Sequence, residues 1–191
     1  MRILAIDQGS VKCGVAMFQG ERVLWTRLLA PTAGRPWLER MRWITDALRA
    51  QLLEQEPPDV VAIEDVMFGV NAKTAVTMGE TRGWLMCAVE HWYPGIRQMA
   101  IAPATVRAAA GAPRDRAGAL RRYQVVASYM LGGAKVSEDE SAAVCIGLAA
   151  QAEIRHAELL ARAGITPTPK PRRRRAGRPT SASPQLVLGS A

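Results

Sequence analysis

Apolar and polar positions along the first 30 residues predict three short β-strands. The apolar runs cover residues 2–7, 13–18 and 22–30, and a tight Gln-Gly-Glu turn joins the second run to the third. Connections this short favour antiparallel pairing between strands that are neighbours in the sequence. We therefore expect the chain to begin with a three-stranded antiparallel sheet.

The next two segments carry different periodicities. One apolar stripe recurs at steps of four, three, four and four residues, namely Trp37, Met41, Ile44, Leu48 and Leu52. This spacing predicts an amphipathic helix, which two prolines at 57–58 end. Residues 59–64 form an apolar run without alternation, the pattern of a strand that is buried on both faces in a parallel arrangement.

The rest of the pattern completes an α/β fold. We expect a helix over 71–91, a strand over 96–102, two helical pieces over 103–110 and 116–131, and a last helix over 138–163 that ends at Gly164. The inward positions expected in the 71–91 helix are Ala75, Met78, Leu85, Met86 and Val89. This order predicts a mixed five-stranded sheet with helices on both faces, which is the outline of a ribonuclease-H-like domain.

The charge divides the chain into a body and a tail. The net charge is +8, and residues 165–191 contribute six of these charges and contain no acidic residue. With its many prolines, this segment is expected to be disordered, which leaves 1–164 as the folded domain. The consecutive arginines of the tail favour an arm that binds a polyanion; they are Arg172, Arg173, Arg174 and Arg175.

Other features of the composition narrow the cellular context. Six further arginines lie between Arg97 and Arg122 with a single acidic residue among them, so two basic zones point to nucleic acid. Cys13, Cys87 and Cys145 lie in apolar runs without a CxxC pair, as expected for buried thiols in a reducing compartment. The sequence shows no signal peptide and no membrane-spanning run, and we expect a cytoplasmic protein.

Two acidic residues end predicted strands. Asp7 follows the first apolar run and Glu64 the fourth, and ligands of open α/β sheets bind beyond strand ends. Alone, each carboxylate is better explained as a turn or helix cap than as a ligand. Together on neighbouring strands, they suit a divalent cation that prefers oxygen ligands. The turn after Asp7 also resembles the phosphate turn of sugar kinases, but their two-domain architecture needs a longer chain.

Four segments together resemble the RuvC family of Holliday-junction resolvases, of bacterial and phage type. These segments are ILAIDQGSVKCGVAM, VVAIEDVMFGVNAKTAVTMGETRG, ATVRAAAG and the acidic start of the final alanine-rich helix, spread over residues 2–155. The resemblance implies a homodimeric endonuclease that cuts four-way DNA junctions symmetrically. It also implies two-metal hydrolysis that uses Mg²⁺, with Mn²⁺ as an alternative ion.

The resemblance assigns metal ligands, one of which is missing. Asp7, Glu64 and Asp139 match the first three acidic ligands, and Ala142 stands at the position of the fourth. Three explanations remain open: an engineered change that traps substrate, a natural lineage that uses Glu138 or Glu140 instead, and a protein that binds junctions without cutting. A regulatory ribonuclease-H-like protein is a more distant alternative.

The resemblance also implies contacts with DNA and with a second subunit. Met67 matches an apolar residue inserted at the junction centre and Phe68 its neighbour, although both residues are equally explained by packing on the next helix. Arg107 matches a basic residue near the scissile phosphate, and Arg116 or Arg114 a second. We expect the 71–91 helix to expose Trp84 and Trp92 at a two-fold interface. The sequence leaves open a branch-migration motor as a partner.

Overall fold

The structure, a computed structural model, describes residues 1–66 and 71–166. Its five strands are β1 (Arg2–Asp7), β2 (Cys13–Gln19), β3 (Arg22–Leu29), β4 (Val60–Glu64) and β5 (Arg97–Ile101). They form one sheet in the order β3-β2-β1-β4-β5. The pairs β1–β2 and β2–β3 are antiparallel, whereas β1–β4 and β4–β5 are parallel. The predicted mixed sheet is confirmed.

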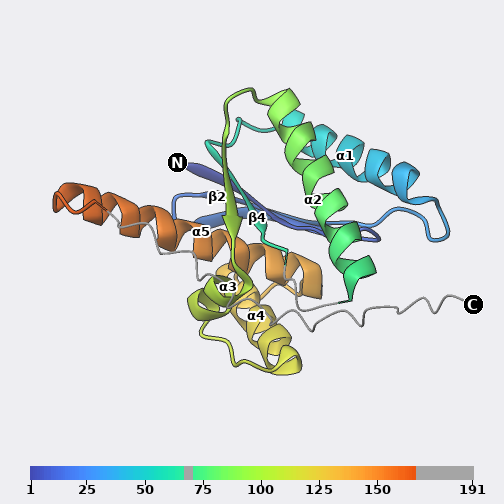
Figure 1. The fold of residues 1–191 in the computed structure, drawn as a ribbon. Coiled ribbons are helices and arrows are strands. Elements are labelled where there is room, and N and C mark those ends of the chain that lie inside the picture. Colours follow the sequence, from blue (N-terminus) through green and yellow to red (C-terminus); the bar gives the residue numbers. More distant parts are fainter. Residues whose placement is uncertain (67–70, 167–191) are drawn as a thin grey trace, which may run out of the picture.

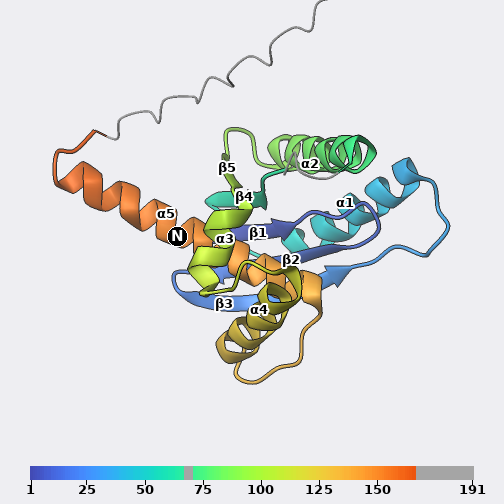
Figure 2. The ribbon, with the colours of Figure 1, turned by 60° about the horizontal axis from the view of Figure 1, so that its bottom comes forward.

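Five helices cover the two faces of this sheet (Figures 1 and 2). They are α1 (Trp37–Leu53), α2 (Ala72–Trp92), α3 (Pro103–Ala110), α4 (Arg116–Met130) and α5 (Glu138–Arg162). Helices α1 and α2 pack on one face, and α3, α4 and α5 pack on the other. Within the described residues, no helix has both the length and the apolarity needed to cross a membrane.

Strand β1 shows why helices pack on both faces of the sheet. Ile3 and Ala5 belong to the core under α5, while Leu4 and Ile6 belong to the core under α1 and α2. All four side chains are fully buried, because successive residues of a strand point to opposite faces. The apolar stripe predicted for 37–52 also faces inward, although Trp37 is only partly buried.

Helix α2 is less buried than its sequence indicates. Leu85 and Val89 are buried as expected, but Ala75, Met78 and Met86 are only partly buried. The expectation that Trp84 and Trp92 are exposed is met only in part. Both are partly buried in the core, where the ring of Trp84 meets that of Trp37 edge-on at 5.8 Å between centroids. The prediction of three buried cysteines fails at one position, because Cys87 is exposed on α2.

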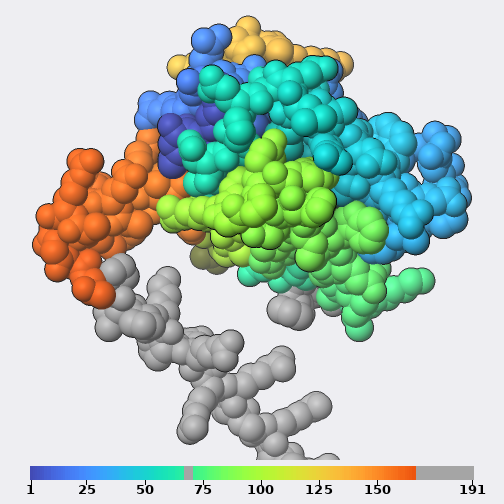
Figure 3. All heavy atoms as spheres, turned by 90° about the horizontal axis from the view of Figure 1, so that it is seen from above, coloured from blue at the N-terminus to red at the C-terminus, as the bar shows by residue number. Residues whose placement is uncertain are grey.

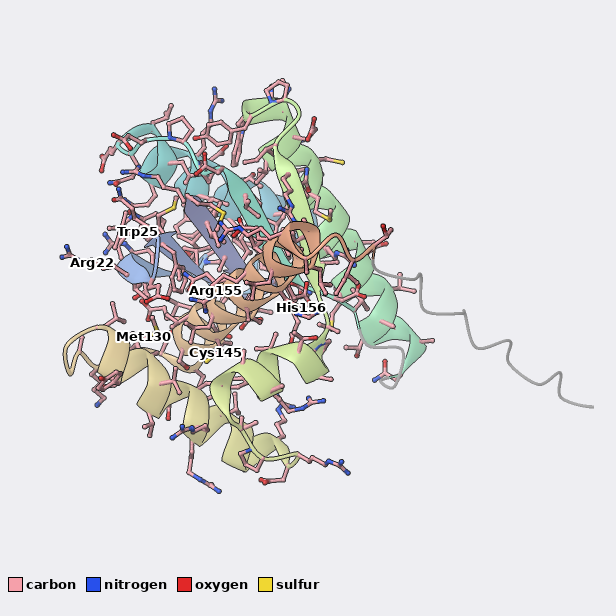
Figure 4. The ribbon with its side chains drawn as sticks, turned by 90° about the vertical axis from the view of Figure 1, so that its left-hand side faces the viewer. Arg22, Trp25, Met130, Cys145, Arg155 and His156 are labelled. Atoms are coloured by element: carbon pink, nitrogen blue, oxygen red, sulfur yellow. The ribbon has the colours of Figure 1, made fainter. Side chains whose placement is uncertain are left out.

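Helix α5 crosses the sheet at close range because two glycines remove side chains from the contact. A Cβ on Gly14 of β2 would lie 2.0 Å from the carbonyl oxygen of Asp139, and a Cβ on Gly147 would lie 2.1 Å from the Phe18 ring. Cys145 of α5 lies in the core shared with Met130 of α4 (Figure 4). The other end of α5 extends beyond the rest of the molecule (Figure 3).

Candidate active site

The strand-end carboxylates lie beside each other at one edge of the sheet. Asp7 ends β1 and Glu64 ends β4, and the parallel register that pairs Ile6 with Ile63 brings the two strand ends level. Both side chains line a cleft of about 390 Å³, which the start of α5 and residues of α3 and α4 also line. The sequence-based expectation that these two acids share a site is therefore matched by their placement.

Electrostatics in this cleft disfavour two ionised carboxylates. Burial, followed by repulsion from Glu64 and Asp139, raises the pKa of Asp7 from 3.8 to about 7. Burial also raises the pKa of Glu64, and the nearby Arg107 opposes that rise. A carboxyl group whose pKa is raised in this way becomes a stronger ligand when a cation is present. The cation offsets the repulsion, because an opposite charge favours the ionised form.

The first turn of α5 distributes its three acids between two tasks. Ser137 and Glu140 form a capping box, in which Ser137 Oγ accepts from Glu140 N–H and Glu140 Oε2 accepts from Ser137 N–H at 3.0 Å. Glu140 Oε1 also accepts from Thr26 Oγ1 at 3.1 Å. Both oxygens of Glu140 are thus engaged outside the cleft, whereas Glu138, Asp139 and Ala142 line it.

Asp139 is paired with a cation from the chain itself. Lys12 Nζ lies 2.5 Å from Asp139 Oδ2. Across residues 1–66 and 71–166, no three His, Cys, Asp or Glu side chains are grouped closely enough to hold a metal ion as they stand. The donor set still suits a hard cation in its chemistry, because carboxylates from β1, β4 and α5 converge on one cleft and offer only oxygen ligands.

A basic rim completes the cleft. Arg107 of α3, Arg114 of the following loop and Arg116 at the start of α4 all line it. The structure thus brings together both candidates for the second basic position. Tyr123 also lines the cleft, and burial raises the pKa of its hydroxyl to about 12. Arginine side chains beside a carboxylate cluster can hold phosphate oxygens while the carboxylates hold a cation.

Comparison with known proteins agrees with this arrangement. The sequence model of a family described as "Crossover junction endodeoxyribonuclease RuvC" matches residues 3–127. This chain belongs to the RuvC family. The matched region includes the strand-end acids and the basic rim but stops before α5, so the family match itself does not reach Asp139 or Ala142. Members of the RuvC family are metal-dependent nucleases.

Two relatives show how far the similarity extends. The RuvC crossover junction endodeoxyribonuclease of Chloroflexus aggregans is 31% identical over 157 residues, which cover 78% of this chain and 90% of the relative. That of Anaeromyxobacter sp. is 31% identical over 153 residues and covers 78% of this chain and 71% of the relative.

Solved structures share the fold. RuvC of Thermus thermophilus in complex with Holliday junction substrate has a TM-score of 0.63 at 22% identity, covering 86% of this chain and 97% of that one. The yeast mitochondrial Holliday junction resolvase has a TM-score of 0.50 at 14% identity, covering 85% and 86%. These likenesses confirm the ribonuclease-H-like architecture that the sequence predicts.

Sequence reasoning missed two residues at the site and placed others outside the described chain. Lys12 and Tyr123 were not identified as site residues, although Lys12 follows Asp7 by five positions within the turn between two predicted strands. That position was the available signal, because such a turn lies at the same sheet edge as Asp7. Met67, Phe68 and the arginines at 172–175 lie outside the described residues, and their roles stay predictions.

Proposed function

We propose that this protein resolves four-way DNA junctions by divalent-metal-dependent hydrolysis of phosphodiester bonds in the cleft beside Asp7 and Glu64. The observation that carries the proposal is the convergence of carboxylates from β1, β4 and α5 with three arginines in one cleft. Membership of the RuvC family supports the substrate class. Because the relatives that match most of this chain are RuvC enzymes of bacteria, we also propose a cytoplasmic enzyme.

The proposed metal ligands are Asp7, Glu64 and Asp139, and the proposed ion is Mg²⁺, for which Mn²⁺ is an alternative. Such an ion acts as a Lewis acid and lowers the pKa of a bound water. In the reaction the water oxygen bonds to phosphorus while the bond from phosphorus to a sugar oxygen breaks. The attacking water gives up one proton to solvent, and the departing oxygen keeps the electron pair and takes up one proton, so the reaction consumes one water. Arg107, Arg114 and Arg116 bind phosphate oxygens and hold the strand in place.

The contacts of Glu138 and Glu140 decide which of them can replace the missing acidic ligand at position 142. Of the two candidates, Glu140 is committed to Ser137 and Thr26, and only Glu138 lines the cleft beside Ala142. Glu138 is exposed, so its charge is largely solvated. We therefore propose that Glu140 acts as a helix cap, and that a replacement ligand, if the site uses one, is Glu138.

The test is cleavage of a synthetic four-way junction with Mg²⁺, compared with a linear duplex of the same sequence. We expect the junction to be cut and the duplex to remain intact. Asp7→Asn and Glu64→Gln should each lower the rate by at least about 100-fold, while Glu158→Gln, an exposed acid on α5, should not. Junction binding without cutting in either Mg²⁺ or Mn²⁺ would identify a binding protein instead.

We also propose that the active form is a homodimer, because a four-way junction offers two symmetric strands that need two sites related by a two-fold axis. The junction-centre contacts proposed for Met67 and Phe68 belong to the same assembly. Sedimentation at micromolar concentration, with and without junction, tests it. A monomer under both conditions would contradict the proposal.

The basic segment 165–191 is proposed to bind DNA without reading its sequence. Each phosphate that it neutralises should add a slope of about 0.7–0.9 in log affinity against log salt. Truncation after Gly164 should therefore flatten the salt dependence while preference for the junction over duplex is kept. An unchanged slope would exclude this role for the six basic residues.

A further inference from the structure

Lys12 reaches the acidic cleft from a loop whose shape is fixed. A Cβ at Gly9 would lie 2.1 Å from the carbonyl oxygen of Lys12, so the turn closes tightly only with glycine there. Arg40 of α1 donates from Nε to the carbonyl oxygen of Ser10 at 2.6 Å. The turn that carries Lys12 is thus tight at Gly9 and tied to α1 through Ser10, and the half-exposed side chain of Lys12 extends to Asp139.

Two basic residues act on the carboxylates of the site in the same direction. Arg107 acts on Glu64 and lowers its pKa against the effect of burial. Lys12 acts in the same direction on Asp7, and its own pKa is raised by the hydrogen bond and charge of Asp139. Lys12 is the cation in contact with the α5 carboxylate, at 2.5 Å between Nζ and Asp139 Oδ2.

The missing fourth acid favours a single metal ion in this cleft. This chain has alanine at position 142 and keeps Asp7, Glu64 and Asp139. Lys12 pairs with Asp139, so a positive charge already stands beside the α5 carboxylate, where a second ion would need a further ligand. A lysine ammonium is a compact point charge, and fixed cations and metal ions play the same role toward a reacting phosphate.

We propose that Lys12 takes the place of a second metal ion, so that the site binds one divalent cation and presents a fixed ammonium to the scissile phosphate. This inference rests on the proposed hydrolytic function. Asp139 shares its carboxylate, with Oδ2 holding Lys12 and the other oxygen left for the cation. Lys12 forms and breaks no covalent bond. Its charge offsets the negative charge that grows on the phosphate oxygens as water attacks.

The first test counts bound metal rather than activity. Electron paramagnetic resonance titration with Mn²⁺ should show one bound ion per chain for the wild type and for Lys12→Met. In the double variant Lys12→Met/Ala142→Asp, the fourth carboxylate is restored and the ammonium removed, so a second Mn²⁺ should bind. Two ions on the wild type, with one lost in Glu138→Gln, would overturn the proposal in favour of Glu138 as the replacement ligand.

The second test compares junction cleavage by variants of Lys12 with cleavage by a variant of a control lysine. Lys12→Met should lower the rate of junction cleavage by about 100- to 1000-fold, while Lys12→Arg should keep a larger part of it. Lys135→Met serves as the control, because Lys135 is exposed like Lys12 but is not the lysine that pairs with Asp139. Equal rates for Lys12→Met and Lys135→Met would overturn the inference, provided that both variants melt near the wild-type temperature.

The two proposals fail separately. If Asp7→Asn abolishes cleavage and Lys12→Met does not change it, the site is a nuclease without a role for Lys12. If Asp7→Asn cuts as fast as the wild type, the proposed function itself is wrong. If the wild type cuts nothing, a second Mn²⁺ that binds to the double variant but not to Ala142→Asp alone still supports Lys12 as the replacement for an ion, and equal counts for these two variants would overturn it.

Discussion

The two faces of the sheet are packed with side chains of different size. Of the 20 buried residues in the core under α3, α4 and α5, nine are alanines. The 14 buried residues described on the opposite face include no alanine and are mostly leucine, isoleucine, valine and methionine. Small side chains let α5 approach the strands closely, whereas the opposite face fills a wider space.

This difference assigns separate tasks to the two faces. Burial of bulky groups under α1 and α2 supplies hydrophobic stabilisation, at about 25 cal/mol for each Å² of apolar surface removed from water. The close contact under α5 fixes where Asp139 stands relative to Asp7, because Gly14 pairs with Asp7 in the sheet and touches the Asp139 backbone. The α5 face therefore sets the geometry of the site.

The strongest test of this assignment is Gly14→Ala. The new Cβ would have to displace the first turn of α5, since the atoms it meets are backbone atoms of Asp139 and Glu140. A shift of about 1 Å can cost 100-fold in rate, so we expect cleavage to fall by at least that factor. Gly83→Ala, on α2 with open space around it, is the control and should cut normally.

Leu48→Ala should separate stability from activity. Leu48 of α1 is fully buried, and such truncations cost about 2–5 kcal/mol. Because the cavity lies on the face away from the cleft, the rate at a temperature where the variant is folded should stay near the wild-type value. Urea unfolding and junction cleavage measure the two quantities, and a 100-fold rate loss in the folded variant would contradict the separation.

Asp7→Asn should show how much the buried carboxylate of Asp7 destabilises the folded, metal-free protein. The pKa of Asp7 is raised to about 7 in the folded state, so its stabilising contribution is present below its unfolded value and is lost as pH rises through 7. Without metal, the variant should be more stable than the wild type at pH 8, by no more than about 4 kcal/mol, and the gain should vanish near pH 4.

Urea unfolding in a chelator at pH 4, 6 and 8 measures this gain. Glu158→Gln, which removes an exposed acid from α5, is the control and should show no pH-dependent difference. A gain of equal size at every pH would mean that the ionised carboxylate is not the source of the cost.

The smallest effect compares two helix caps. Ser137→Ala removes the capping box of α5, and Asn71→Ala removes the side chain that caps α2 through Thr74 N–H. Each should cost about 1 kcal/mol of stability. Only Ser137→Ala should also slow cleavage, because Ser137 begins the turn that carries Asp139. Equal rates for the two variants would mean that the cap does not position the acid.

Much of the fold could be predicted because short turns and periodicity are local. The turn around Gly20 forces β2 and β3 to pair antiparallel, and the non-alternating run 59–64 becomes the parallel strand β4 between two neighbours. Helix periodicity locates an inward face but not how much of it is covered. For that reason it misjudged Trp84, which packs on Trp37, and Cys87, which is exposed.

The site could be predicted only as far as strand ends define it. Asp7 and Glu64 follow from the positions where their strands stop. Glu140 could not be distinguished from Glu138 by its residue type, since both are carboxylates in one helical turn, and only the partners Ser137 and Thr26 separate them. The reach of Lys12 depends on a loop closed by Gly9 and Arg40, which no local pattern reveals.

The uneven support of α5 has a consequence for hydrogen exchange. Its buried residues extend from Ser141 to Ile154, and Gln151 donates to the carbonyl oxygen of Gly20 at 2.7 Å. Among the described residues, the part of the helix beyond Ile154 has the partly buried Leu160 and the exposed ion pair of Arg155 with Glu21. Amides of 155–162 should therefore exchange by local fraying, while those of 144–151 exchange only with global unfolding. The end of the helix can open repeatedly while the turn that carries Asp139 stays closed.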